Sequence, residues 1–378
     1  MDSKGCNAGQ FSIPAFVAFD SDGALSRSGL TYRIALRWII FLAFACLVTI
    51  WVASAVAQEQ EWSLVVRLNP ALDDIVPLDA TVERLAGNFG FTEGPVWMRK
   101  GGYLLFSDIA ANVIDKWSPS GGKVSIFLAY SGFTGADPAT VGLQLDTGDR
   151  VVTLLGSDGV TLDPQGRVVY CAHGDRQVVR LEEDGKRTVL VSQYEGKRLN
   201  SPDDLVYKSD GSLYFTDPPF GLRDRDKDPK KELAFNGVYL LKSGKLLLLS
   251  RDLTGPNGLA FSPDEKHLYI IDSSKKSILR FDVQPDDTIA NGQIFMDMNS
   301  DKAHGGPDGM KVDDRGNVYC TGPGGLWIIS PDGKHLGTVL TPENLTNLAF
   351  GDADGKTLYM TGHTGLSRIH LKIPGIRP

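Results

Sequence analysis

The stretch that decides the fold is "GGPDGMKVDDRGNVYCTG", residues Gly305 to Gly322. A polar residue, Asp308, leads into a short apolar run, and a turn rich in Asp and Gly separates this run from a second one. Such an order predicts a β-hairpin, because turn-forming residues divide two runs that favour extended structure. The chain repeats nearly the same pattern five more times.

Six copies of the hairpin follow one another along the chain. Aligned on the leading polar residue, they begin at Glu93, Asp158, Asp203, Asn257, Asp308 and Thr346. The steps of 65, 45, 54, 51 and 38 residues between them are typical of arrays whose unit is a four-stranded sheet. Further strand-like runs, such as "RQVVRLEEDGKRTVLV" from Arg176, lie between the copies. The sequence therefore predicts an all-β fold, a six-bladed β-propeller with four antiparallel strands per blade.

The last copy supplies only about three strands, whereas "TVERLAG", from Thr81, precedes the first copy as a spare strand. We predict that this N-terminal strand completes the last blade, because an open ring would expose unpaired strand edges. A ring of seven blades, or a last sheet built from C-terminal residues alone, would contradict this prediction. The propeller is accordingly expected to span residues 81–378, with residues 58–80 as a linker.

An apolar run of 20 residues, Trp38–Ala57, follows Arg33 and Arg37 and ends in a small-x-small pattern. This order is typical of a secretory signal, although the apolar part is long enough to span a bilayer as a signal anchor. We expect residues 1–57 to be an N-terminal extension and signal peptide that is cleaved after Ala57. The expected location of the protein is then periplasmic or secreted.

Charge and motifs exclude several function classes. Residues 1–57 carry four basic and three acidic side chains, so the remainder holds 35 Lys and Arg against 43 Asp and Glu, a net charge of −8. Such a surface argues against nucleic acid or an anionic membrane as a partner. The sequence contains no G-x-S-x-G, H-E-x-x-H, C-x-x-C or dinucleotide fingerprint, so serine hydrolase, zinc protease and hydride-transfer chemistry have no support.

Two cysteines, Cys171 and Cys320, stand at the same place in the second strand of two different copies. Equivalent strands of separate blades should hold their Cα atoms further apart than the roughly 7 Å that a disulfide allows. We expect both thiols to be buried and unpaired.

The six leading residues should converge at one mouth of the central channel, because the innermost strand of each blade borders that channel. Turn chemistry accounts for an isolated Asp158 or Asp203, but Glu93 is not a turn former. Several carboxylates near one axis also repel one another, and a cation would relieve that repulsion. Carboxylate and amide oxygens without Cys or His suit a hard ion such as Ca²⁺, Mg²⁺ or Mn²⁺, whereas Zn²⁺ would be atypical.

Loops at the same face should carry further functional groups, because sites on propellers form on such loops. The ends of the second strands place Asp108, His173, Asp217, Asp272, Gly322 and His363 there, and the loops into the first strands add Arg198, Asn200 and His304. The segments richest in hydrogen-bond donors are "CAHGDR" and "KRLNSPDD". We select His173, Arg198, Asn200 and Asp203 as candidate substrate-binding residues.

The chain resembles the SMP-30/gluconolactonase/luciferin-regenerating family in four segments. They are "FTEGPVW", "RLNSPDDLVYKSDGSLYFTD", "GPNGLAFSPDEKHLYI" and "GPDGMKVDDRGNVYCTG". The resemblance runs from about Val82 to the C-terminus. Members of that family are six-bladed propellers that hydrolyse lactones with a divalent metal ion.

The resemblance implies roles for individual residues. Glu93, Asn257 and Asp308 would be metal ligands, and Asp203 stands where the family carries a residue that touches metal or substrate. Asn200 would face the substrate, and Asp308 would transfer the proton. His304, in "AHGGPDG", matches no expectation from the family.

The sequence thus predicts a lactonase that opens a sugar-acid lactone, such as gluconolactone, at the channel mouth. One divalent ion, with Ca²⁺ first and Mn²⁺, Mg²⁺ or Zn²⁺ as alternatives, would be held by Glu93, Asp203, Asn257 and Asp308. A metal can activate an ester without a Ser or Cys nucleophile, which suits a chain without a nucleophile motif. Two other classes stay open: a non-catalytic propeller that binds a ligand or protein, and an enzyme resembling strictosidine synthase.

Overall fold

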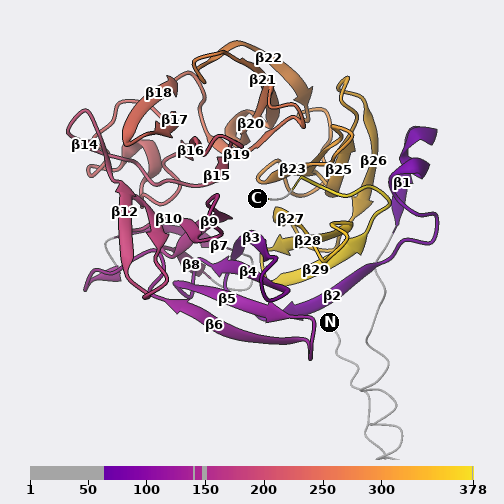
Figure 1. Cartoon of the computed structure of the whole chain (residues 1–378), viewed down its shortest axis with the longest axis horizontal. Helices are drawn as coiled ribbons and strands as arrows, with labels where there is room; N and C mark the ends of the chain where they lie inside the picture. The colour runs from indigo at the N-terminus through magenta and orange to yellow at the C-terminus, as the bar shows by residue number, and fades with distance from the viewer. Residues whose placement is uncertain (1–63, 139–140, 147–150, 377) are drawn as a thin grey trace, which may run out of the picture. The chain divides into compact units, whose positions relative to one another are not determined.

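Six antiparallel sheets surround a central axis in the computed structural model, which describes residues 64–138, 141–146, 151–376 and 378 (Figure 1). The predicted signal segment and its cleavage site lie outside the described residues. In each sheet the first strand of the repeat lies innermost and contacts the inner strands of the two neighbouring sheets. The predicted six-bladed propeller, with four antiparallel strands in each blade, is confirmed.

Each blade is a meander that runs outward from the channel. Blades 1 to 3 consist of β3 (Thr92–Met98), β4 (Tyr103–Asp108), β5 (Val113–Ser118), β6 (Lys123–Ala129); β9 (Ser157–Leu162), β10 (Val168–Ala172), β11 (Gln177–Leu181), β12 (Arg187–Val191); and β15 (Leu205–Tyr207), β16 (Leu213–Asp217), β17 (Gly237–Lys242), β18 (Lys245–Ser250). Blades 4 to 6 consist of β19 (Pro256–Phe261), β20 (His267–Asp272), β21 (Ser277–Val283), β22 (Ile289–Asp297); β23 (Met310–Val312), β24 (Val318–Gly322), β25 (Gly325–Ile329), β26 (His335–Leu340); and β27 (Leu345–Gly351), β28 (Thr357–Gly362), β29 (Gly365–His370), β2 (Val82–Gly87).

The N-terminal strand closes the ring, as predicted. Strand β2 pairs antiparallel with β29 and forms the outer edge of blade 6 (Figure 1). Glu83 lies directly opposite Arg368 in this pair, and their side chains form an ion pair of 2.7 Å. The last sheet is therefore built from both ends of the propeller, so neither end leaves blade 6 incomplete.

The segment expected to be a linker, residues 58–80, has structure of its own from residue 64 on. Strand β1 (Val65–Arg67) pairs with β26 and gives blade 5 a fifth strand. The 3₁₀ helix η1 (Pro70–Asp74) follows and buries Leu72 completely. A strand of three residues is too short to produce a period-two pattern, so β1 has no recognisable signal in the sequence.

The core lies between neighbouring blades. The second strands of blades 2 to 6 carry a tyrosine at the same repeat position, and all five side chains are buried: Tyr170, Tyr214, Tyr269, Tyr319 and Tyr359. Repetition of one large side chain keeps successive blades equally spaced, because each blade packs only against its neighbours.

Apart from β1 and η1, four short elements of the described residues lie outside the blade strands. They are the hairpin of β7 (Leu143–Asp146) and β8 (Val151–Leu154), the hairpin of β13 (Gln193–Tyr194) and β14 (Lys197–Arg198), and the 3₁₀ helices η3 (Arg225–Lys227) and η4 (Ser273–Lys275). No helix among the described residues is long and apolar enough to cross a membrane.

Candidate active site

A cavity of about 540 Å³ opens at one mouth of the central channel. Five of the six leading polar residues of the repeat line it, namely Glu93, Asp158, Asp203, Asn257 and Asp308. They come from the starts of five different inner strands or from the residues just before them. The sequence argument for convergence at this mouth is thus confirmed for these five side chains.

Glycine explains how the polar residues reach the channel. It follows the leading residue in four copies, at Gly94, Gly159, Gly258 and Gly309. The backbone N–H of Gly258 donates to the carbonyl oxygen of Asp308 in the next blade at 2.9 Å, and a Cβ on Gly258 would lie 2.5 Å from that oxygen. A side chain would therefore prevent the close approach of neighbouring blades. The dipeptide serves contact between blades rather than a hairpin turn.

The carboxyl groups of the cavity repel one another. Burial raises the pKa of the Glu93 carboxyl well above its usual range, and the charges of Asp308 and Asp203 raise it further. Burial likewise raises the pKa of Asp158 and of Asp203 well above the usual range, with neighbouring carboxylates as the second cause. Four carboxyl groups with raised pKa values lie in one cavity, so their repulsion must be relieved either by protonation or by a bound cation.

Asp308 is held by its neighbour Asn257. The Asn257 side-chain N–H donates to Asp308 Oδ1 at 2.6 Å, and the Asp308 backbone N–H donates to Thr321 Oγ1 at 2.8 Å. Burial raises the pKa of Asp308 to about 7, while the hydrogen bond from Asn257 opposes that rise. The carboxyl is therefore fixed in orientation and poised to gain or lose a proton near neutral pH.

His173 lies beside two of the carboxyls and is fully buried. Its Nδ1 is 3.0 Å from the Pro202 carbonyl oxygen and 3.3 Å from Asp158 Oδ2. Because a carbonyl can only accept, Nδ1 carries the proton. Burial lowers the pKa of His173 to about 4, so the ring is neutral at pH 7 and does not offset the acidic charge.

These donors fit a divalent cation. One ligand atom each from Asp158, His173 and Asp203 lie within 4.8 Å of one another, and the remaining carboxyl and amide oxygens line the same cavity. Buried carboxylates without a partner cation are costly to ionise. An oxygen-rich, anionic set of this kind suits a hard ion.

The sequence analysis placed Asp158 at the channel mouth but did not select it as a ligand, and it missed one wall of the cavity. The Asp158 side chain lines the cavity beside Asp203. An apolar wall also contains Leu143 and Leu145 of β7 and Leu154 of β8. The step of 65 residues between the first and second copies, longer than any other step, is the only sequence signal for that insertion.

Three other predicted residues, Asn200, Arg198 and His304, are not among those that line this cavity. Asn200 is fully buried, and its side-chain N–H groups donate to the carbonyl oxygens of Asp217 and Phe235. Arg198 lies in a separate cavity, where its Nη2 donates to the Asp175 carbonyl oxygen. His304 is exposed, and its Nδ1 lies 2.6 Å from Asn344 Oδ1.

The sixth leading residue, Thr346, does not line the cavity. Its hydroxyl donates to the Thr92 carbonyl oxygen at 2.7 Å and joins two inner strands. The next residue, Asn347, instead forms a side-chain hydrogen bond with Glu93 that lowers the pKa of that carboxyl. The polar position of blade 6 is thus shifted by one residue, at a bulge in β27.

The ends of the second strands divide into two groups. Asp108, Asp217 and Asp272 each accept hydrogen bonds from two consecutive backbone N–H groups just before the inner strand of their own blade. These carboxyls therefore hold the loops in place. In blades 2 and 6 the residue that directly follows the second strand is a histidine, and both His173 and His363 line the cavity.

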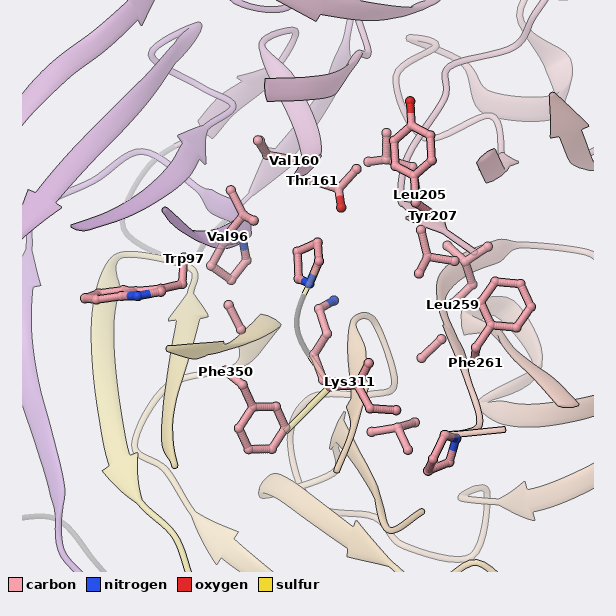
Figure 2. A pocket seen from close by; sticks show the side chains of 18 of the residues that line it. Val96, Trp97, Val160, Thr161, Leu205, Tyr207, Leu259, Phe261, Lys311 and Phe350 are labelled. Carbon is pink, nitrogen blue, oxygen red and sulfur yellow. The ribbon is translucent and has the colours of Figure 1, made fainter. Parts of the chain in front are cut away.

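The other end of the channel is chemically different. A cavity of about 130 Å³ lies further along the same inner strands, lined by apolar residues such as Val96, Leu259 and Phe350 (Figure 2). Its charged lining residues are Lys311 and Glu265, so it lacks a converging set of metal donors. The carboxyl and amide oxygens lie at the opposite, acidic mouth.

Comparisons with known proteins agree with this geometry. Residues 91–364 match the SMP-30/Gluconolactonase/LRE-like region. The chain is 35% identical to a gluconolactonase of Zymomonas mobilis, a match that covers 82% of this chain and 87% of that one. It is 28% identical to regucalcin of Xenopus laevis over 71% of this chain and 82% of that one. Among solved structures, a gluconolactonase of Xanthomonas campestris superposes with a TM-score of 0.68 at 32% identity, covering 81% of this chain and 94% of the other. Within the part of the chain that the structure describes, Cys171 and Cys320 are both unpaired and buried, as expected.

Proposed function

The chain belongs to the SMP-30/gluconolactonase/LRE-like family, and we propose that it is a lactonase that uses a divalent metal ion to open a sugar-acid lactone at the acidic mouth of its channel. The observation that carries the proposal is the group of four buried carboxyls with raised pKa values in one cavity. The similarity to a gluconolactonase over most of both chains supports lactone hydrolysis.

The predicted ligands Glu93, Asp203, Asn257 and Asp308 would hold the ion, and Asp158 lies close enough to join them. When bound, a divalent ion supplies Lewis-acid polarisation of the lactone carbonyl. The protein fixes its donors in advance through the close packing of blades at the glycines, so little reorganisation is needed on binding.

Asp308 would move the proton. A water oxygen attacks the carbonyl carbon, the ring C–O bond breaks, and the ring oxygen leaves as a hydroxyl group, which gives a hydroxy acid. Asp308 takes the proton from the water and returns it to the ring oxygen. The hydrogen bond from Asn257 holds Asp308 Oδ1 in one orientation, so Oδ2 would face the water. A bound cation would lower the pKa of Asp308 and so weaken it as a base.

Polar side chains at the rim would bind the hydroxyl groups of a sugar lactone. Ser273, Ser274 and Arg225 line the cavity together with the leucines of β7 and β8. A ligand with both hydroxyl groups and apolar surface would match this mixed lining.

The test is hydrolysis of a panel of sugar lactones, alkyl lactones and aryl esters by the purified protein. After chelation and dialysis, activity should be lost, and Ca²⁺, Mn²⁺, Mg²⁺ or Zn²⁺ added singly should restore it. Full activity in the presence of a chelator would contradict the metal requirement. Hydrolysis of none of the lactones with any metal would contradict the proposed activity.

We also propose export, on the evidence of the sequence of residues 38–57. Mass spectrometry of the N-terminus of the protein purified from its own cells should find residue 58 first. An intact segment in the membrane fraction would indicate a signal anchor.

A further inference from the structure

The hairpin of β7 and β8 adds apolar surface to the acidic cavity. Leu143 and Leu145 of β7 and Leu154 of β8 line this cavity together with the proposed metal donors. The two strands form a small sheet of their own, and each of the six blades has its four strands without them. The hairpin is therefore an addition to the channel mouth and not a part of the propeller scaffold.

The strand pattern gives the hairpin one apolar face. In β7 the leucines alternate with exposed polar residues. Leu143 lies opposite Leu154, and Leu145 lies opposite Val152. Opposite residues of an antiparallel pair project to the same side of the sheet. These four side chains therefore share one face, and three of them line the cavity.

Packing against the propeller accounts for only part of this face. The β8 side chains of the face are buried in a small cluster with Phe91 and Ile109 of blade 1. Leu143 and Leu145 belong to the same cluster but are only partly buried. A purely structural role would have buried these two leucines as well. They leave apolar surface in the cavity, where contact with water is unfavourable.

The hairpin is anchored at the residue that precedes β7. The Gly142 backbone N–H donates to the Gly221 carbonyl oxygen at 3.1 Å. Gly142 has a φ of +78°, a conformation that favours glycine. Phe220, the neighbour of Gly221, also lines the cavity and is partly buried. The anchor thus joins the hairpin to a loop that supplies a further apolar group to the same cavity.

We propose that the lactone opened at this site carries an apolar substituent, which Leu143 and Leu145 bind while the ester group lies at the metal donors. The cavity of about 540 Å³ is of the size that takes a ring with a substituent, since ligand pockets range from about 300 to 1,000 Å³. Burial of the substituent would remove apolar surface of both partners from water. This inference rests on the proposed function, because it names the substrate class of the same site.

Two lactones with the same ring test the preference. The probes are δ-valerolactone and δ-decalactone, which adds a pentyl group, and the metal-loaded protein is assayed in a pH-stat. After division by the rate of alkaline hydrolysis of each lactone, kcat/KM should be about tenfold or more higher for δ-decalactone, because each buried methylene favours binding. Equal corrected values for the two lactones would overturn the inference.

Lactams separate this inference from the proposed activity, because a lactam resists the hydrolysis that opens a lactone. In isothermal titration calorimetry 6-pentyl-2-piperidone should bind about tenfold more tightly than δ-valerolactam. If this preference is found but neither lactone is hydrolysed, the apolar subsite stands and the proposed function fails. Equal affinities of the two lactams, or no saturable binding of either, would overturn the subsite even if the lactones are hydrolysed.

Variants of the hairpin locate the subsite. Leu145→Ala should lower the ratio of the two lactam affinities about threefold, through loss of apolar contact, and should leave the affinity for δ-valerolactam unchanged. Val151→Ala is the matched control, because this side chain belongs to the same hairpin, is 64% exposed and does not line the cavity. Leu143→Ala gives the same test if Leu145→Ala does not fold. An unchanged ratio in the leucine variant, or an equal fall in the control, would refute the subsite.

Discussion

At the scale of single residues, the acidic mouth depends on burial more than on contacts. Asp308 and His173 are both buried ionisable groups, but burial moves their pKa values in opposite directions, to about 7 and about 4. Burial disfavours the charged form of each group, which is the anion for Asp and the cation for His. At neutral pH the cavity therefore holds a neutral imidazole and, when no cation is bound, an Asp308 carboxyl that keeps its proton to higher pH than an exposed aspartate does.

Asp308→Asn should reduce kcat about 100-fold or more at saturating metal, because the amide keeps an oxygen donor but cannot move the proton. Glu93→Gln is the comparison: it should act mainly through metal affinity and be partly rescued by excess ion. Steady-state kinetics over a range of metal concentrations separate the two effects. If Asp308→Asn retains near-full turnover, proton transfer by this residue is excluded, and His173 becomes the next candidate.

Asp158→Asn should have two opposite effects. Metal affinity should fall about tenfold, since one of the donors loses its charge, while the chelated protein should unfold at a higher temperature at pH 8, because one source of repulsion with Asp203 is gone. Calcium titration and calorimetry measure these two quantities. Asp184→Asn, in the exposed turn of the same blade, should change neither. An unchanged metal affinity in Asp158→Asn would exclude this side chain from the metal site.

At the scale of elements, the unit that builds the site is the polar residue with the glycine that follows it. In blade 4, Asn257 lines the cavity, and Gly258 brings the inner strand against the inner strand of blade 5. The sheet register shifts at this dipeptide in β19, between Pro256 and Leu259. A bulge of this kind turns a side chain out of the normal alternation, here into the channel.

Gly258→Ala should destabilise the protein by about 2 kcal/mol, since overpacking against a rigid backbone has that typical cost. The new methyl would lie 2.5 Å from the Asp308 carbonyl oxygen, so metal affinity should fall as well. Urea denaturation gives the change in the free energy of unfolding. Gly306→Ala, with nothing within 4 Å of the added carbon, is the matched control and should be close to neutral. Similar losses in both variants would refute the close-approach explanation.

At the scale of the whole molecule, closure by β2 fixes the ring on which all six inner strands depend. The five cavity-lining polar residues come from five blades, so opening of any interface between blades would separate metal donors. Repulsion among the carboxyls pushes the blades apart, whereas a bound cation would attract the same carboxyls and hold the blades together. Stability, pH and metal binding should therefore be coupled.

The chelated protein should become less stable as pH rises from 5 to 8. Its cavity carboxyls, together with Asp217, whose pKa burial raises to about 7, bind protons in the folded state that the unfolded chain has already lost above pH of about 4. Unfolding then releases protons, and the free energy of unfolding falls as pH rises toward 7. His173 opposes this trend only between about pH 4 and 6.5, and it is one group against several.

Differential scanning calorimetry should show a fall in Tm of about 5 °C or more over this range. Excess divalent ion should remove the fall, because it stabilises the ionised carboxylates of the folded state. A chelated protein whose Tm rises from pH 5 to 8 would show that the carboxyls are already compensated, and the cation would then have no electrostatic role in stability.

The sequence by itself determined the six copies, the closing strand from Thr81, the separation of Cys171 from Cys320 and the positions of the polar residues that line the channel. These features repeat once per blade, and rotation about one axis brings equivalent positions together, so local pattern is enough to predict them. Tertiary structure alone decided which loop residues reach the cavity. Arg198 and Asn200 have the right chemistry and chain position, yet one lies in a separate cavity and the other is buried against backbone carbonyls. The leucines of β7 and β8, which no repeat in the sequence singles out, do line the cavity. Loops have no period, so their side chains are placed by the particular surfaces they pack against, and that information exists only in the folded chain.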